Sequence, residues 1–283
     1  MASIGVVTDS TAYLERAFVE EHDVKVVPLK IIMDDISYRE GIDISNQEFY
    51  DRLKQPGVFP TTSQPSAGEF LEAYREMAGR YDALISIHIS AGISGTCDSA
   101  RSAAAEMGDY PIEVIDSRFT AIQLAMFIEE LVKGRDKGMG MDDLKSMADR
   151  MISQSQLLFL VDTLEYLHRG GRIGGAQAFM GSMLKIKPIL YIDGTIDALE
   201  KVRGSGKASE RLVEIVAERV GNRKVRVGIV NVVAEERMNE VAAKLQERLG
   251  EKMVSLSKAE VGPVIGCHVG PGTIGVGFFP VAD

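Results

Sequence analysis

The sequence has few of the features that stabilise secreted proteins or bind nucleic acids. Its 283 residues include no tryptophan and only two cysteines, Cys97 and Cys267, far apart in the chain. A disulfide framework is therefore excluded and a reducing compartment is expected. Basic residues are also scarce, because 32 of them face 41 acidic ones and leave a formal charge of −9 without a long basic tract. Nucleic acid is therefore not expected as a partner.

Signals for metals, cofactors and export are missing as well. The chain has neither a CxxC pair nor an HExxH helix, and its histidines are scattered at His22, His88, His168 and His268, so no zinc site is expected. Its start shows no basic segment before an apolar one, and its apolar runs are too short or too charged to cross a bilayer. We predict a soluble, cytoplasmic protein with no transmembrane segment, metal or cofactor.

Generic nucleotide and hydrolase motifs also fail. The run from Gly270 to Gly275 matches GxGxxG. A strand is expected to follow it, however, whereas a dinucleotide fingerprint needs a helix there and an acidic residue about 20 positions later. Gly206-Lys207 is followed by Ala208, so a Walker loop is absent. Thr96 stands where the GxSxG elbow around Ser94 would need glycine.

The first half of the chain predicts a parallel sheet. At about 150 residues per domain the length predicts two domains, and a 45% hydrophobic content supports a sizeable core. Apolar runs alternate with helical spacing, as in βα units. The strands expected here are 4–8, 24–29, 83–89 and 112–115. We predict an N-terminal α/β domain over residues 1–156, with a mostly parallel sheet and flanking helices.

The second half predicts a different sheet. Asp193-Gly194 is typical of a two-residue hairpin turn, so at least part of this sheet should be antiparallel. Helices are expected at about 207–220 and 235–249. The expected strands are 157–161, 186–192, 195–202, 225–230 and 273–278. We predict a C-terminal α/β domain over residues 157–283 that closes a ligand cleft.

Two segments rich in hydroxyl side chains precede predicted helices in the first domain. Thr61–Ser63 lies just before a helix that should begin at Ser66, where Glu69 completes a capping box. Ser94–Thr96 opens another helix, and Gly95 would let a ligand approach the backbone. Helix N-termini attract carboxylates and phosphates. Ordinary capping is the better explanation of one such segment, but for two at the shared edge of a parallel sheet an anion site is an equal alternative.

Two features of the second half admit both a structural and a functional interpretation. His268 lies among small residues, where it is either a structural histidine or a side chain that reaches across a cleft between the domains. Residues 168–207 carry a net charge of +4, which leaves −13 for the rest of the chain. This segment is either a solvated face or a docking patch for a negatively charged group or partner.

Taken in order, several short motifs make the chain recognisable. They are Thr62-Ser63-Gln64-Pro65-Ser66, Ile93-Ser94-Gly95-Thr96, Leu164-Glu165-Tyr166-Leu167 with Gly170-Gly171-Arg172-Ile173, Leu184-Lys185-Ile186-Lys187-Pro188, Lys201-Val202-Arg203 and His268-Val269-Gly270-Pro271-Gly272. Over essentially its whole length the sequence resembles the DegV family, bacterial fatty-acid-binding proteins that include the FakB subunits of fatty acid kinase. It departs from the family at Ala91-Gly92, where a second serine is common, and at Cys97, where an aromatic residue is more usual.

The resemblance implies a two-domain α/β protein that encloses one long-chain fatty acid. The family's carboxylate site maps onto Thr62 and Ser94, and the side and main chains expected nearby are those of Ser63, Gly95, Thr96 and His268. Such proteins are not enzymes themselves. They present the acid to a separate ATP-dependent kinase subunit, which makes the acyl phosphate for phospholipid metabolism. The kinase-facing basic residues map onto Arg172 and Arg203, and we expect the chain to act as a monomer.

The energetics of a fatty acid suit this interpretation. About 15 buried methylenes contribute roughly 12 kcal/mol before the costs of binding, so the polar groups mainly position the carboxylate. Two alternatives remain open. One is an acyl hydrolase that uses Ser94 and His268, although no orienting acid is identifiable. The other is a protein that holds a phosphorylated metabolite in the same anion site.

Overall fold

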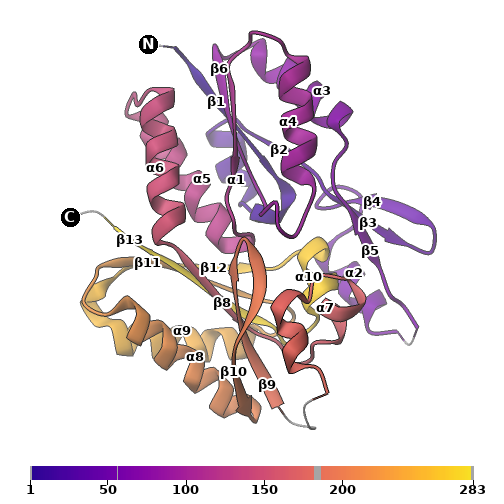
Figure 1. The fold of residues 1–283 in the computed structure, drawn as a ribbon, viewed down its shortest axis with the longest axis vertical. Helices are drawn as coiled ribbons and strands as arrows, with labels where there is room; N and C mark the ends of the chain where they lie inside the picture. Colours follow the sequence, from indigo (N-terminus) through magenta and orange to yellow (C-terminus); the bar gives the residue numbers. More distant parts are fainter. Residues whose placement is uncertain (1, 56, 182–185, 282–283) are drawn as a thin grey trace. The chain divides into compact units, whose positions relative to one another are not determined.

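The computed structural model describes residues 2–55, 57–181 and 186–281, which form two compact units, 1–153 and 154–283. Figure 1 follows the chain from indigo to yellow. Leu184 and Lys185, which belong to one of the motifs above, lie outside the described residues. In that described part, no helix is long and apolar enough to span a membrane, and no group of three or more His, Cys, Asp and Glu side chains is placed to hold a metal ion.

The first unit contains the predicted parallel sheet. Its strand order is β2-β1-β6-β7, and every neighbouring pair is parallel. The strands are β1 (Ile4–Asp9), β2 (Val24–Val27), β6 (Ala83–His88) and β7 (Ile112–Asp116). Figure 1 shows α3 (Ala67–Ala78) and α4 (Thr96–Glu106) on one side of this sheet, and α5 (Ala121–Asp136) and α6 (Met141–Gln154) on the other. Helices on both sides explain why every residue of β1 and β6 is buried.

Local sequence determines where α3 begins. Ser66 Oγ accepts the Glu69 N–H at 3.3 Å, and the Glu69 carboxylate accepts the Ser66 N–H at 2.9 Å, so the predicted capping box is present. The buried face of α3 carries Phe70, Tyr74 and Met77, which pack in one apolar cluster with residues of the sheet. This packing holds α3 against the sheet.

A small antiparallel sheet was not expected from the sequence. Its order is β4-β3-β5, formed by β3 (Lys30–Met33), β4 (Ile36–Arg39) and β5 (Thr61–Ser63), and α2 (Asn46–Leu53) lies between β4 and β5 in the chain. The expected strand 24–29 ends at Val27, just before Pro28, and the chain resumes as β3. Strands of three and four residues with polar side chains leave little periodic signal. The segment Thr61–Ser63, which was predicted to be a loop, is the short strand β5.

The second unit contains a six-stranded mixed sheet with the order β10-β9-β8-β13-β11-β12. Its strands are β8 (Gln156–Leu160), β9 (Ile186–Asp193), β10 (Thr195–Arg203), β11 (Val225–Asn231), β12 (Met253–Glu260) and β13 (Ile274–Pro280). All neighbouring pairs are antiparallel except β11 and β12. The β9–β10 hairpin turns at Gly194 as predicted, with φ of +77°. Edge strand β12 was missed, because polar and charged residues interrupt its apolar pattern.

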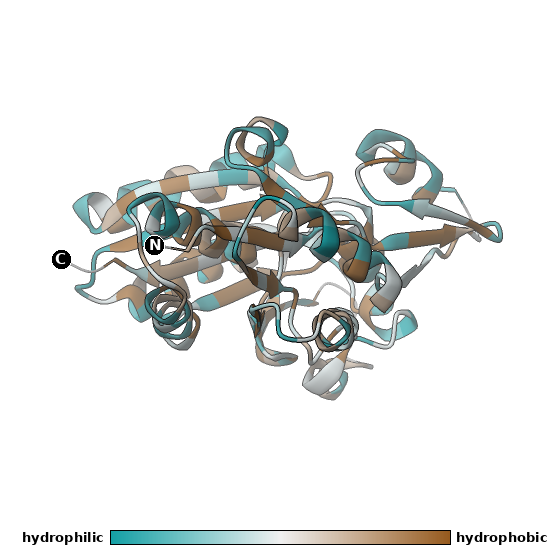
Figure 2. Cartoon of the chain, turned by 90° about the horizontal axis from the view of Figure 1, so that it is seen from above, coloured by the Kyte–Doolittle hydropathy of each residue, from teal (hydrophilic) through white to brown (hydrophobic). Residues whose placement is uncertain are grey.

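Helices α8 (Ser205–Val220) and α9 (Glu235–Leu249) pack against each other and against this sheet. Leu212 and Val216 of α8 join Val241 and Leu245 of α9 in a single buried cluster with strand residues. Figure 2 shows the result, with hydrophobic residues concentrated in the strands and hydrophilic residues on helix surfaces and turns.

Shorter elements complete the chain. They are η1 (Ser10–Ala12), α1 (Arg16–Glu21), α7 (Glu165–Arg169), η2 (Gly174–Phe179), η3 (Gly250–Lys252) and α10 (Pro263–Val269). His268 is therefore in the last turn of a short helix, α10, which was not predicted. Pro263 at the start of this helix supplies the fixed φ that favours a first helical turn.

Candidate functional site

The two hydroxyl segments of the first unit lie together. Gly95 is the residue before α4, and a Cβ placed on it would lie 2.8 Å from Cδ of Gln64, which directly follows β5. A side chain at position 95 would displace the Gln64 amide, which is packed against the N-terminus of α4. Thr62, two residues before Gln64, is paired in register with Ile31 of β3 and is partly buried. The structure thus brings the Thr62 segment beside the Ser94 segment.

A tight turn after β6 sets the orientation of Ser94. The Ser90 carbonyl accepts the N–H groups of Ile93 at 3.2 Å and Ser94 at 3.1 Å. Ser94 Oγ lies 2.8 Å from Thr96 Oγ1 and accepts the Thr96 N–H at 3.4 Å. The hydroxyls of Ser94 and Thr96 therefore stand together at the N-terminus of α4, where the helix dipole favours a negative charge.

Ser63 has a more peripheral position. Its side chain is exposed, and its Oγ donates to the carbonyl of Gln64 at 3.1 Å. Gln64 itself was not singled out from the sequence. Its position inside the motif Thr62-Ser63-Gln64-Pro65-Ser66 was visible, but nothing local showed that its amide would contact a glycine about thirty residues away.

Cys97, the second residue of α4, has an unreactive thiol. Its side chain is completely buried, and its Sγ lies 3.5 Å from the Ile89 carbonyl. Burial raises the pKa of this thiol to about 12, and nearby Asp116 adds to the shift. Since the thiolate is the reactive form, Cys97 packs the base of the turn and does not supply a nucleophile.

In the second unit, His268 lies beside Arg172. A Cβ on Gly170 would lie 2.9 Å from Cε1 of His268, and Arg172 Nη1 donates to the Gly170 carbonyl at 2.8 Å. Burial and, to a smaller extent, the positive charge of Arg172 lower the pKa of His268 to about 4. The imidazole is therefore neutral near pH 7, next to a permanent cation.

The lowered pKa of His268 should make the free energy of unfolding depend on pH. Because its folded pKa of about 4 lies below the ordinary value of 6.5, the neutral form stabilises the fold above pH 6.5, and this stability is lost as the pH falls toward 4. Between pH 7.5 and pH 5, wild type should lose about 2 kcal/mol more unfolding free energy than His268→Gln. Urea unfolding at both pH values measures this. Equal losses in the two proteins would contradict the prediction.

Arg172 and Arg203 lie at different places on the second unit. η2 follows Arg172 and runs along β10, since a Cβ on Gly175 would lie 2.6 Å from Asp197 Cγ and Lys201 Nζ lies 4.6 Å from the centre of the Phe179 ring. Between Asp197 and Arg203 the strand advances about 20 Å at roughly 3.3 Å per residue. Arg172 therefore belongs with His268, whereas Arg203 stands at the far end of β10.

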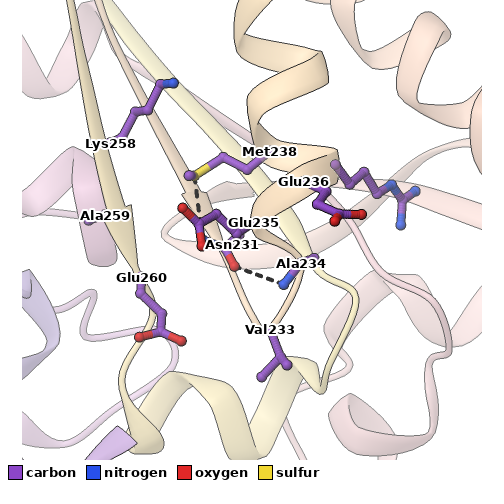
Figure 3. Close-up of a pocket in the computed structure, with 10 residues that line it drawn as sticks. Asn231, Val233, Ala234, Glu235, Glu236, Met238, Lys258, Ala259 and Glu260 are labelled. Atoms are coloured by element: carbon purple, nitrogen blue, oxygen red, sulfur yellow. Dashed lines mark hydrogen bonds between the residues drawn. The ribbon is translucent and has the colours of Figure 1, made fainter. Parts of the chain in front are cut away.

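A separate hollow of about 710 Å³ opens at the C-terminal ends of β11 and β12, beside the start of α9 (Figure 3). Asn231 is committed to its neighbours, because Oδ1 accepts the Ala234 N–H at 2.8 Å and Nδ2 lies 3.4 Å from Met238 Sδ. Three carboxylates (Glu235, Glu236 and Glu260) and two cations (Arg237 and Lys258) line the hollow, so its net negative charge disfavours a carboxylate. The chemistry of this hollow does not suit an anionic ligand.

Comparisons with known proteins agree over almost the whole chain. The model of a family described as uncharacterised proteins of the DegV family matches residues 3–281. A DegV domain-containing protein of Streptomyces coelicolor is 38% identical over 275 residues, 96% of this chain and 97% of that protein.

Solved structures are similar as well. A DegV family protein from Thermus thermophilus, described by its fatty acid binding, matches with a TM-score of 0.93 at 32% identity, over 99% of this chain and 100% of that one. DegV of Bacillus subtilis, described as a fatty acid binding protein, matches with a TM-score of 0.90 at 34% identity, again over 99% and 100%. These matches confirm the predicted α/β fold.

Proposed function

The chain belongs to the DegV family, and we propose that it binds one long-chain fatty acid and presents the carboxylate to a separate ATP-dependent fatty acid kinase. One observation supports the location of the carboxylate site. The contact of Gln64 with Gly95 joins two hydroxyl-bearing segments at the N-terminus of α4. The fatty acid binding described for the relatives from Thermus thermophilus and Bacillus subtilis supports the choice of ligand.

Each group in this site has a physical role toward a carboxylate. The Thr62 and Ser94 hydroxyls donate hydrogen bonds to its oxygens, while Thr96 and the free end of α4 add donors and a favourable dipole. Gly95 allows the ligand to approach the backbone, and exposed Ser63 adds a peripheral hydroxyl. His268 is proposed to contact the same carboxylate, and its place there stays a prediction.

A carrier fits the local chemistry better than a hydrolase does. In a Ser–His–Asp hydrolase the histidine is oriented by a carboxylate and accepts the serine proton. His268 instead has the guanidinium of Arg172 beside it, which disfavours an imidazolium. Ser94 Oγ pairs with the hydroxyl of Thr96, which is no base at neutral pH. We therefore assign no catalytic residue and no cofactor to this chain, and leave phosphoryl transfer to the kinase.

The kinase is proposed to dock on the basic face that carries Arg172 and Arg203. Both side chains are exposed, and a permanent cation with five donors suits acidic side chains or phosphate groups of a partner. Because Arg203 is roughly 20 Å along β10 from Asp197, the strand residue beside η2, such a partner would have to cover an extended surface. This supports a protein partner in preference to a small anion.

Purified protein should carry a long-chain fatty acid in a one-to-one ratio. Most of the affinity would come from burial of the acyl chain, so the ligand should survive purification. Native mass spectrometry, followed by extraction and analysis of the lipid, measures both the ratio and the chain length. A bound phosphorylated metabolite, or an empty protein that hydrolyses p-nitrophenyl esters, would contradict the carrier function.

A further inference from the structure

A chain of buried polar side chains crosses the core of the first unit. Tyr74 Oη lies 2.8 Å from Ser86 Oγ, and Ser86 Oγ lies 2.7 Å from His88 Nε2. His88 Nδ1 in turn lies 3.2 Å from Asp9 Oδ2. All four side chains are fully buried. They link helix α3 with strands β6 and β1.

This order imitates a Ser–His–Asp triad, but its position excludes catalysis. Ser86 is in the middle of β6, where Val7 of β1 and Val114 of β7 flank it in register. A nucleophile must reach a substrate, whereas each member of this chain is sealed in the core. These buried side chains must therefore act through the backbone groups that they hold in place.

The hydrogen bonds fix the donor and acceptor roles at the Asp9 end. Asp9 accepts four: from the N–H and Oγ1 of Thr11 at 3.0 and 2.6 Å, from the N–H of Ile89 at 2.8 Å and from His88. An acceptor at Asp9 requires His88 to carry its proton on Nδ1. Between His88, Ser86 and Tyr74 the donor can lie on either side, and both directions leave one proton for each contact.

At its Asp9 end, this series of hydrogen-bonded side chains holds the turn that carries Ser94. Asp9 and Ile89 are 80 residues apart, at the C-terminal ends of neighbouring parallel strands. Ile89 has both backbone groups engaged, its N–H by Asp9 and its carbonyl by the Cys97 thiol. Ser90 follows it, and the Ser90 carbonyl accepts the Ser94 N–H. A continuous path of bonds therefore runs from the Asp9 carboxylate to Ser94.

We propose that Asp9 is a positioning residue for the fatty acid carboxylate, which acts by anchoring the Ile89–Ser94 turn so that the Ser94 hydroxyl faces the ligand. The proposal rests on the function proposed above. An anchored hydroxyl loses little freedom when it binds, and this preorganisation favours affinity. Asp9→Asn keeps the shape of the side chain but leaves one acceptor oxygen in place of two. Its NH₂ group then faces donors either at Thr11 or at Ile89 and His88, and either arrangement weakens the hold on the turn.

A double-mutant cycle tests this inference. Oleate is titrated into delipidated wild type, Asp9→Asn, Ser94→Ala and the double variant by calorimetry, well below each protein's Tm. Each single variant should bind about tenfold more weakly, and the double variant also about tenfold, because both changes remove the same contact. A hundredfold loss in the double variant would overturn the proposal, since Asp9 would then act independently of Ser94. Unchanged affinity in Asp9→Asn would overturn it as well.

Two further measurements separate positioning from stability. Ala148→Gly, in a buried position on α6, loses stability without touching the turn and should bind oleate as wild type does. If it binds as weakly as Asp9→Asn, general destabilisation explains the effect and the proposal fails. Hydrogen exchange at the Ile89 amide should accelerate in Asp9→Asn, and unchanged protection would also overturn the proposal.

A milder variant covers the case in which Asp9→Asn does not fold. Thr11→Val removes one donor to Asp9 and should weaken oleate binding about threefold, with no further loss when combined with Ser94→Ala. Additive losses would again overturn the positioning role. Failure of the proposed function looks different: wild type would then bind no oleate, or Ser94→Ala would bind it as wild type does.

Discussion

Arg203→Ala is expected to reduce kinase-dependent formation of acyl phosphate at least tenfold, while the affinity for fatty acid stays unchanged. Arg203 is exposed at the last position of β10, at the far end of η2 from the Arg172–His268 pair. Loss of a cation at a docking face slows association and weakens the complex. The ligand site should not be affected, because no residue of the proposed carboxylate site is on β10.

The assay is formation of acyl phosphate from oleate-loaded protein, ATP and a purified bacterial fatty acid kinase, together with calorimetric titration of oleate. Arg248→Ala is a matched control, since Arg248 is an exposed cation on α9, which packs on β11 and β12 at the opposite end of the same sheet. The oleate bound to this variant should be phosphorylated at the wild-type rate. Equal rates for Arg203→Ala and Arg248→Ala would mean that the kinase docks elsewhere.

Arg172→Ala should impair phosphorylation in the same assay and still retain the fatty acid. It differs from Arg203→Ala in one respect, because removal of its charge should raise the pKa of neighbouring His268, which Arg172 lowers. Titration of the His268 ring by NMR would show this shift in Arg172→Ala only. Loss of both phosphorylation and binding in either variant would reassign that arginine to a structural role.

Gly95→Ala is expected to weaken fatty acid binding at least tenfold and to leave the fold intact. At φ of −77° the backbone accepts alanine without strain. The new methyl group would lie 2.8 Å from Cδ of Gln64, so the amide end of that flexible side chain must move away. The methyl group would then cover the N-terminus of α4, where the carboxylate is proposed to bind.

Gly68→Ala provides a matched control in the first turn of α3. A Cβ there meets only Ser66 Oγ, at 3.9 Å, and alanine is a better helix former than glycine. Its oleate affinity should be close to that of wild type, and its Tm should be equal or slightly higher. If Gly95→Ala binds oleate as tightly as Gly68→Ala does, the proposed site at α4 is wrong.

Local patterns account for what could be predicted of the fold. The apolar runs of β1 and β6, the Ser66–Glu69 capping box and the Asp193-Gly194 turn each depend on neighbours a few residues away. Two strands escaped prediction for different reasons: β5 has only three residues, and the eight-residue edge strand β12 mixes polar with apolar positions. In such segments the partner strand, and not the local sequence, decides the conformation.

The sequence by itself determined the α/β architecture, the DegV resemblance and the small set of hydroxyls proposed to meet the carboxylate. Only the tertiary structure decided how they are held: Gln64 against Gly95, Asp9 bonded to the backbone of Ile89, and Arg172 with His268 but apart from Arg203. The physical reason is that these contacts join residues distant in the chain. Strand register and helix packing determine which of them meet, and no local periodicity encodes that choice.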